Sequence, residues 1–230
     1  MRESENFEFA ALSEARNYRA AIARLFSPYL SGDVLEIGAG IGQMLMDVTK
    51  ICKPRSISAV EPDPQFISEL QRKLPDARIW RGLENDVPAS ESFDAILSVN
   101  VLEHIEKDAD ELAKWRERLS PREGHLCLLV PACPELYSSI DSDFGHFRRY
   151  TKQDLKGKLV SAGFTNIELN YFNLVGYFAW LLNFKILNQR RFNPTAVRSF
   201  DRFVFPVSQR LENAIGWRPF GQSLVAVAKT

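Results

Sequence analysis

The most informative chemistry lies in residues 34–42, which read Val-Leu-Glu-Ile-Gly-Ala-Gly-Ile-Gly. A short apolar run, suited to a buried strand, carries a carboxylate, and three alternate glycines follow. Glycines tolerate positive φ and leave the backbone open to a ligand, so a nucleotide-like molecule is expected here. A dinucleotide turn spaces its glycines GxGxxG, whereas this GxGxG turn follows an acid that can receive a cation. The predicted cofactor-binding residues are Glu36, Gly38, Ala39, Gly40 and Gly42.

A second acid stands where it would serve the same ligand. Residues 56–60 are strand-like and are followed by Glu61-Pro62-Asp63-Pro64. Glu61 lies about twenty residues beyond the glycine turn, where a strand-end acid accepts hydrogen bonds from both ribose hydroxyls. Pro64 suits the first turn of the next helix. We therefore place Glu61 and Pro62 in the predicted cofactor site.

Residues 93–105 add a third stretch in the same order, Phe-Asp-Ala-Ile-Leu-Ser-Val-Asn-Val-Leu-Glu-His-Ile. Together the three stretches resemble the class I S-adenosylmethionine (SAM) methyltransferases, in which the glycine turn wraps the amino-acid moiety and ribose of the cofactor. The resemblance implies that SAM is the cofactor and that Asn100, at a strand end, contacts its methionine portion. His104 is expected to cap or orient its loop rather than to take a proton.

The same resemblance assigns roles to two further segments. The loop after residues 77–80 would cover the adenine edge, and its candidates are Leu83 and Glu84. Gly82 stands where the family often has an acid. Nearer the amino terminus, Tyr18 would close over the cofactor, and simple helix packing is an equally good explanation for it.

Residues 137–151 resemble the lys…D…GHxRRYt stretch of bacterial methyltransferases that accompany glycosyltransferases in cell-surface polysaccharide and glycolipid pathways. A neutral alcohol attacks a sulfonium methyl poorly, so oxygen methylation needs a base, and a histidine suits that duty. His146 is the predicted base, with Asp141 as the alternative. The predicted acceptor-binding residues are Tyr137, Arg148 and Arg149. Paired arginines can hold an anionic group, or they pair with Asp141 and Asp143 and pin the loop.

The elements that must position these residues alternate along the chain. Such alternation predicts an α/β fold with a doubly wound, mostly parallel, seven-stranded sheet of the Rossmann-like methyltransferase type. Residues 1–230 are predicted to form one domain, with an amino-terminal helical segment at 1–30 (its helix at 7–30). The expected strands are 33–37, 56–61, 77–80, 93–99, 124–131, 165–172 and 222–229, and the expected helices are 42–51, 64–74, 107–119 and 152–161.

A helical insertion, residues 173–218, is predicted between the last two strands, because about 45 residues are too many for a turn. The insertion is rich in aromatic and basic residues. Three roles stay open for it: a lid over the acceptor, a homodimer interface, or peripheral contact of residues 171–202 with anionic lipid. Polar residues interrupt its apolar run, which argues against a membrane-spanning helix.

Composition narrows the function classes. Acidic and basic residues balance at zero formal net charge, which argues against nucleic acid as a partner. The three cysteines lack zinc spacing, so no metal site is predicted, and free thiols indicate the cytoplasm, or the inner membrane surface if the insertion binds lipid. The predicted function is SAM-dependent methyl transfer to oxygen of a small-molecule, glycan or glycolipid acceptor. The alternative is a non-catalytic SAM- or nucleotide-binding or scaffolding module that uses the insertion as an interface.

Overall fold

A computed structural model describes residues 13–121, 123–216 and 218–230, and its centre is a seven-stranded sheet of order β3-β2-β1-β4-β5-β7-β6. All neighbouring pairs are parallel except those that involve β7, which runs antiparallel to both β5 and β6. The predicted doubly wound, mostly parallel sheet is confirmed. The strands are β1 (Asp33–Ile37), β2 (Ser56–Glu61), β3 (Arg78–Arg81), β4 (Ala95–Val99), β5 (His125–Pro131), β6 (Thr165–Phe172) and β7 (Ser223–Lys229).

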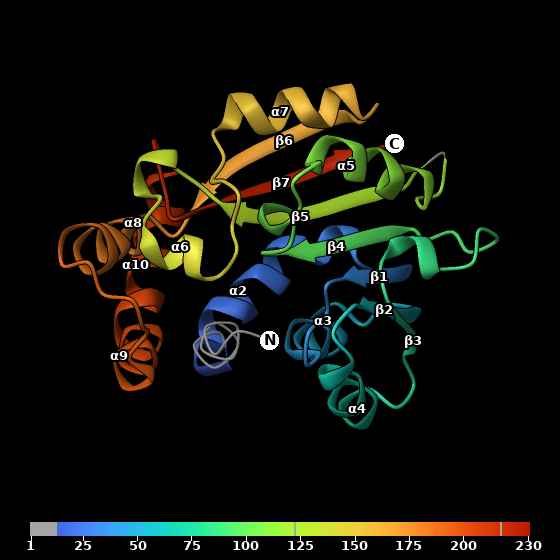
Figure 1. The fold of residues 1–230 in the computed structure, drawn as a ribbon, viewed down its shortest axis with the longest axis horizontal. Coiled ribbons are helices and arrows are strands. Elements are labelled where there is room, and N and C mark those ends of the chain that lie inside the picture. The colour runs from blue at the N-terminus through green and yellow to red at the C-terminus, as the bar shows by residue number, and fades with distance from the viewer. Residues whose placement is uncertain (1–12, 122, 217) are drawn as a thin grey trace.

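Helices cover both faces of this sheet, and each face buries its own core (Figure 1). Successive strand residues point to opposite faces, so neighbours such as Val34 and Leu35 belong to different cores. The first core packs against α5 (Asp108–Glu117) and α7 (Lys152–Ser161). The second packs against α2 (Arg16–Phe26), α3 (Gln43–Cys52) and α4 (Pro64–Lys73).

The helices begin and end at residues whose types explain those limits. Asp63 accepts a hydrogen bond from the Gln65 amide at the start of α4, and Thr151 does the same for Asp154 at the start of α7. Gly163, at φ +87°, follows α7 and turns the chain toward β6. The expected helix at 7–30 is shorter in the described residues: α2 ends at Phe26 and passes into the 3₁₀ turn η1 (Ser27–Tyr29), while residues 1–12 lie outside the description.

Short elements connect the strands near the carboxyl edge of the sheet. A 3₁₀ turn, η2 (Glu84–Asp86), follows β3, and another, η3 (Leu102–His104), follows β4. After β5 come η4 (Pro134–Leu136) and the one-turn helix α6 (Ser139–Asp143). These turns carry several of the residues singled out in the sequence.

Helices occupy the segment between β6 and β7, as the sequence predicts. They are α8 (Leu174–Trp180), the π-helical η5 (Leu181–Ile186), α9 (Pro194–Ser199), the π-helical η6 (Phe200–Val204) and α10 (Phe205–Ile215). Figure 1 shows α8, α9 and α10, in orange, beyond the end of the sheet toward which β4 and β5 point. Ligands of doubly wound sheets bind at that end.

One carboxylate joins this insertion to the amino-terminal helix. Asp201 in η6 accepts hydrogen bonds from the backbone amides of Asn17 and Tyr18, both at 2.9 Å. The Asn17 side chain donates in turn to the Asp201 carbonyl, also at 2.9 Å. Amides in the first turn of a helix lack intrahelical partners, and an acid there complements the helix dipole. Asp201 therefore fixes the start of α2, and with it Tyr18, against the insertion.

Candidate functional site

The glycine turn after β1 has the backbone that its sequence predicts. Gly38, Gly40 and Gly42 all have positive φ, between +53° and +77°. A Cβ atom on Gly38 would lie 2.5 Å from Val101 Cγ2, and one on Gly42 would lie 2.6 Å from Leu70 Cδ1. Both positions therefore require glycine on grounds of conformation and of space.

Two buried acids flank the turn. Glu61 accepts hydrogen bonds from the Gly40 amide at 2.7 Å and the Asp63 amide at 2.8 Å, so it holds the turn as well as marking the end of β2. Burial raises the pKa of Glu61, against these two backbone hydrogen bonds, which lower it. A carboxylate has further lone pairs, so Glu61 keeps acceptor capacity for a ribose.

Glu36 is the unusual acid of the pair. It is 2% exposed, and no described residue hydrogen-bonds its Oε2 atom. Burial, together with the negative charge of Glu61, raises the pKa of the Glu36 carboxyl well above its usual range. An isolated buried carboxylate is costly, so this arrangement favours a cationic group beside Glu36.

The loop after β3 only partly matches its expected role. Leu83 follows Gly82 and is exposed, free to pack on a flat ligand. Glu84 is buried, and its burial, followed by the negative charge of Glu111 in α5, raises the pKa of its carboxyl. The structure therefore directs Glu84 into the helix layer rather than toward the glycine turn. Pro62, by contrast, is exposed beside Glu61 at the end of β2.

A cavity of about 290 Å³ lies between the carboxyl edge of the sheet and the insertion. Asn100, at φ +54° after β4, reaches its wall, and so does Tyr18, whose hydroxyl lies 3.2 Å from Ser223 Oγ. Burial raises the pKa of Tyr18 to about 12, so its hydroxyl stays protonated. Aromatic rings on the wall are Phe144, Trp180, Phe184, Phe192, Phe200 and Phe205, and polar side chains include Asn173, Asn183, Gln189 and Gln222.

His146 also reaches this cavity, with Asp141 behind it. The Nδ1 atom of His146 lies 3.1 Å from Asp141 Oδ1, and Arg149 Nε donates to the same oxygen at 2.8 Å. Asp141 Oδ2 accepts from the amide and hydroxyl of Ser138. Although burial alone would raise it, the hydrogen bond to His146 and the charge of Arg149 lower the pKa of Asp141. Asp141 is fully buried and engaged at both oxygens, so it orients His146 and does not reach the cavity.

The paired arginines point to different places. Arg149 is 5% exposed, lines the cavity, and lies over the Trp180 ring at 4.3 Å. Arg148 pairs instead with Asp108 of α5 at 2.6 Å and donates to the Glu106 carbonyl. Of the two, the structure brings only Arg149 to the cavity.

Tyr137 is likewise a supporting residue. Its hydroxyl donates to the His146 carbonyl at 2.7 Å, which holds the loop rather than an acceptor. His104 edges onto the His146 ring, with centroids 4.6 Å apart. Burial and the neighbouring His146 lower the pKa of His104 to about 4.

Several residues at the cavity were not singled out from the sequence. Asn173 follows β6 and caps α8 by accepting from the Gly176 amide, and its side chain donates to Gln222 at 2.7 Å. Ser223 is the first residue of β7, and Gln222 comes directly before it. Because β7 is antiparallel, its first residues lie at the edge where the parallel strands end, a consequence that the strand order alone could have signalled.

Comparison with known proteins agrees with this geometry. The family model described as a methyltransferase domain matches residues 10–169, more than half of the chain. A comparison with curated protein sequences gives no significant match.

Solved structures share the fold at low sequence identity. A SAM-dependent methyltransferase from Archaeoglobus fulgidus is 15% identical, with 94% of each chain covered and a TM-score of 0.61. Phosphoethanolamine N-methyltransferase 2 of Haemonchus contortus, in complex with phosphomonomethylethanolamine and S-adenosylhomocysteine, is 15% identical with a TM-score of 0.62. The match covers 93% of the present chain and 52% of the worm protein. The CurJ carbon methyltransferase is 16% identical over 88% of this chain and 49% of its own, with a TM-score of 0.58.

Proposed function

The chain belongs to the methyltransferase-domain family and uses S-adenosyl-L-methionine as its cofactor, and from this premise we propose that it methylates an oxygen of a small-molecule, glycan or glycolipid acceptor. The observation that supports the proposal is the cavity beside Asn100 and His146, which is lined by aromatic rings together with amide and guanidinium groups. Aromatic faces suit the apolar faces of sugars or lipid chains, and the polar groups fix orientation. The family match does not favour the alternative of a non-catalytic module.

The residues around the glycine turn fit the cofactor. SAM supplies an electrophilic methyl group when bound. Glu36 offers a buried oxygen without a described hydrogen-bond partner to the positive charge of its amino-acid portion, and Glu61 offers acceptor capacity to the ribose. Gly38, Ala39, Gly40 and Gly42 leave the backbone open. Asn100 lines the cavity, and the side chain of the next residue, Val101, lies against Gly38, so Asn100 suits the methionine portion.

His146 is the residue that we propose promotes loss of the acceptor proton. Asp141 lies 3.1 Å from one ring nitrogen and orients the imidazole, and the His146 side chain lines the cavity. Such an imidazole can take the proton itself or hold a cation that acidifies the hydroxyl. Asp141 acts as the positioning residue, and Arg149 is the proposed acceptor-binding cation. Proximity and alignment of the acceptor oxygen supply the remaining acceleration.

The acceptor proposal is tested by methyl transfer from isotopically labelled SAM to a panel of glycans, glycolipids, small phenols and alcohols, and matched amines. We expect label on an oxygen of a hydroxylated member, located by mass spectrometry of the product. Label confined to nitrogen or carbon would refute oxygen methylation. Absence of label from every hydroxylated member would count against the proposed acceptor class.

For the outer surface of the insertion we propose peripheral contact with anionic lipid through residues 202–215, farther along the chain than the segment 171–202 expected from the sequence. Four exposed apolar residues of η6 and α10 recur at every fourth position, so they form one stripe along the helix; they are Phe203, Val207, Leu211 and Ile215. Exposed arginines, Arg202 and Arg210, flank it. An apolar face bordered by cations suits a membrane surface with anionic headgroups. Within the described residues, no helix is long and apolar enough to cross a membrane.

We expect the protein to float with phosphatidylglycerol vesicles in a density gradient, and the double variant Phe203→Glu and Leu211→Glu to stay at the bottom. Val160→Glu, an equally exposed apolar position on α7, is the matched control and should float. Flotation should weaken as salt rises, because headgroup attraction is screened. If light scattering instead shows a dimer that the same double variant dissociates, while vesicles bind neither protein, the stripe is a subunit interface and this proposal is wrong.

A further inference from the structure

Three possible metal ligands converge at the inner end of the cavity. Glu103, His104 and His146 each offer a carboxylate oxygen or ring nitrogen, and these three atoms lie within 4.8 Å of one another. Glu103 and His146 also line the cavity. Two imidazoles and one carboxylate are the ligand set of several catalytic zinc sites, which keep a further position open.

Main-chain contacts hold the elements that carry these ligands together. Glu103 and His104 belong to η3, which follows β4, whereas His146 comes from the loop after α6. A main-chain hydrogen bond from the Phe147 amide to the Glu103 carbonyl, at 2.8 Å, ties the two segments together. Ligands of a tetrahedral site lie about 3.4 Å apart at metal–ligand distances of about 2.1 Å. Rotamer adjustments of about 1 Å would therefore close the group around an ion.

Each of the two histidines also has a second hydrogen-bonding partner on its ring, as metal-bound histidines usually do. His146 contacts the Asp141 carboxylate at 3.1 Å, and His104 hydrogen-bonds the backbone carbonyl of Phe144. Metal-bound histidines almost always bond a carboxylate or carbonyl through their other nitrogen, which fixes the tautomer and the ring orientation.

We propose that Glu103, His104 and His146 bind a divalent transition-metal ion of the Zn²⁺ type, whose open side faces the acceptor cavity. Its role rests on the proposed function: the ion takes the acceptor oxygen as a further ligand and lowers the pKa of that hydroxyl. The hydroxyl then loses its proton to water, the bond from oxygen to the methyl carbon forms, and the bond from that carbon to the cofactor's sulfur breaks. In this arrangement His146 promotes proton loss as a ligand of the ion.

Cobalt(II) binding to metal-depleted protein tests the site directly, because cobalt substitutes for zinc and has visible absorption bands. We expect one equivalent to bind and to raise the melting temperature. Glu103→Gln and His104→Gln should each weaken binding by about tenfold or more, since each removes one of three ligands. His125→Ala, the third histidine, should bind cobalt normally, and calorimetry should show that all variants still bind SAM.

The proposal is wrong if wild-type protein binds no cobalt, if both ligand variants bind it normally, or if the spectrum shows thiolate charge-transfer bands from the cysteines. It is also wrong if chelated and zinc-loaded enzyme methylate acceptors at the same rate. Stoichiometric cobalt binding without oxygen methylation of any acceptor would leave the ion site standing and refute the proposed function instead.

Discussion

Replacing Gly40 with valine should abolish SAM binding, measured by isothermal titration calorimetry. Gly40 has φ +53°, which a β-branched residue hardly adopts, and its amide donates to Glu61 at 2.7 Å. A valine there would strain the turn and fill the space above it. Gly157→Val is the matched control, because a Cβ at Gly157 in α7 meets nothing within 4 Å. We expect the control to bind SAM normally, and unimpaired binding by Gly40→Val would contradict the assignment of this turn.

The same calorimetric titration, repeated at several pH values, should show that SAM affinity depends on the protonation of Glu36. Its pKa is raised in the free protein, so below that pKa the carboxyl carries a proton that a cationic ligand must displace. SAM affinity should therefore rise with pH, by at most about tenfold per pH unit, and level off above the pKa of free Glu36. Glu36→Gln should lower affinity about ten- to hundredfold and flatten this pH dependence. A variant with an unchanged profile would remove Glu36 from the cofactor site.

The second large effect concerns His146. His146→Ala should lower kcat by about a hundredfold or more while SAM affinity stays nearly constant, because the ring faces the acceptor cavity and not the glycine turn. Asp141→Asn should lower kcat less, by about tenfold, since the ring remains but its orientation is weakened. The kcat of each variant is measured by steady-state kinetics on an acceptor found in the labelling panel.

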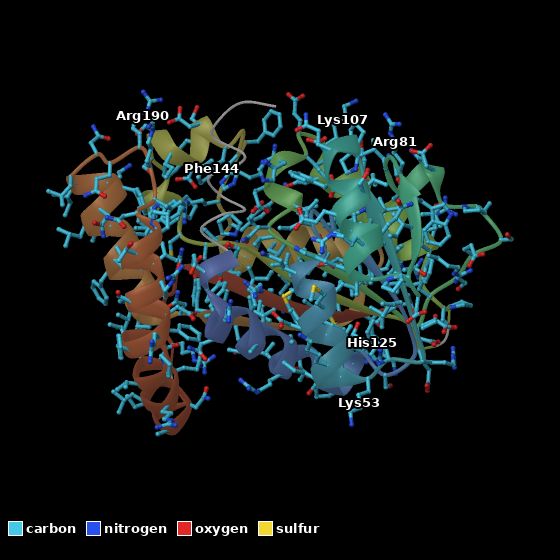
Figure 2. The ribbon with its side chains drawn as sticks, turned by 90° about the horizontal axis from the view of Figure 1, so that it is seen from below. Lys53, Arg81, Lys107, His125, Phe144 and Arg190 are labelled. Carbon is cyan, nitrogen blue, oxygen red and sulfur yellow. The ribbon has the colours of Figure 1, made fainter. Side chains whose placement is uncertain are left out.

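His125 supplies the control for that substitution. It stands at the start of β5, and its ring is tilted against that of Tyr29, with centroids 5.2 Å apart. Figure 2 shows it far from Phe144, which lines the cavity. His125→Ala should leave kcat unchanged. If His146→Ala also left kcat unchanged, simple positioning of the acceptor, without a proton acceptor or an ion, would be the better description of the reaction.

Arg148 and Arg149 are adjacent in the loop after α6, but their contacts differ, so we expect substitutions at the two positions to have different effects. Arg149 is buried between Asp141 and the cavity, whereas Arg148 is bound to Asp108 on the helix layer. Adjacent residues of an extended segment point to opposite sides. The sequence motif contains both arginines and cannot say which one faces inward.

The residues around Gly38 and Glu61 were predictable from the sequence because their conformations are set locally. Alternate glycines demand positive φ, apolar runs of five to seven residues demand burial on both faces, and proline and Thr151 mark helix starts. Strand and helix order then leaves few topologies for a mostly parallel sheet. These signals sufficed for the fold class, for the strand limits to within two residues, and for the backbone conformation of the glycine turn.

Tertiary contacts decided the rest, since they depend on residues far apart in the chain. Asp201 caps α2 from more than 180 positions away in the sequence. Glu84 lies near Glu111 of α5. Ser223 lies at the cavity, 3.2 Å from the Tyr18 hydroxyl, because β7 runs antiparallel to its neighbours. The convergence of Glu103 and His104 with His146 has the same origin: a loop some forty residues later folds back over the end of β4. Sequence spacing predicts no metal site, because spacing rules describe ligands that are near in sequence. Long-range packing alone brings these three side chains together.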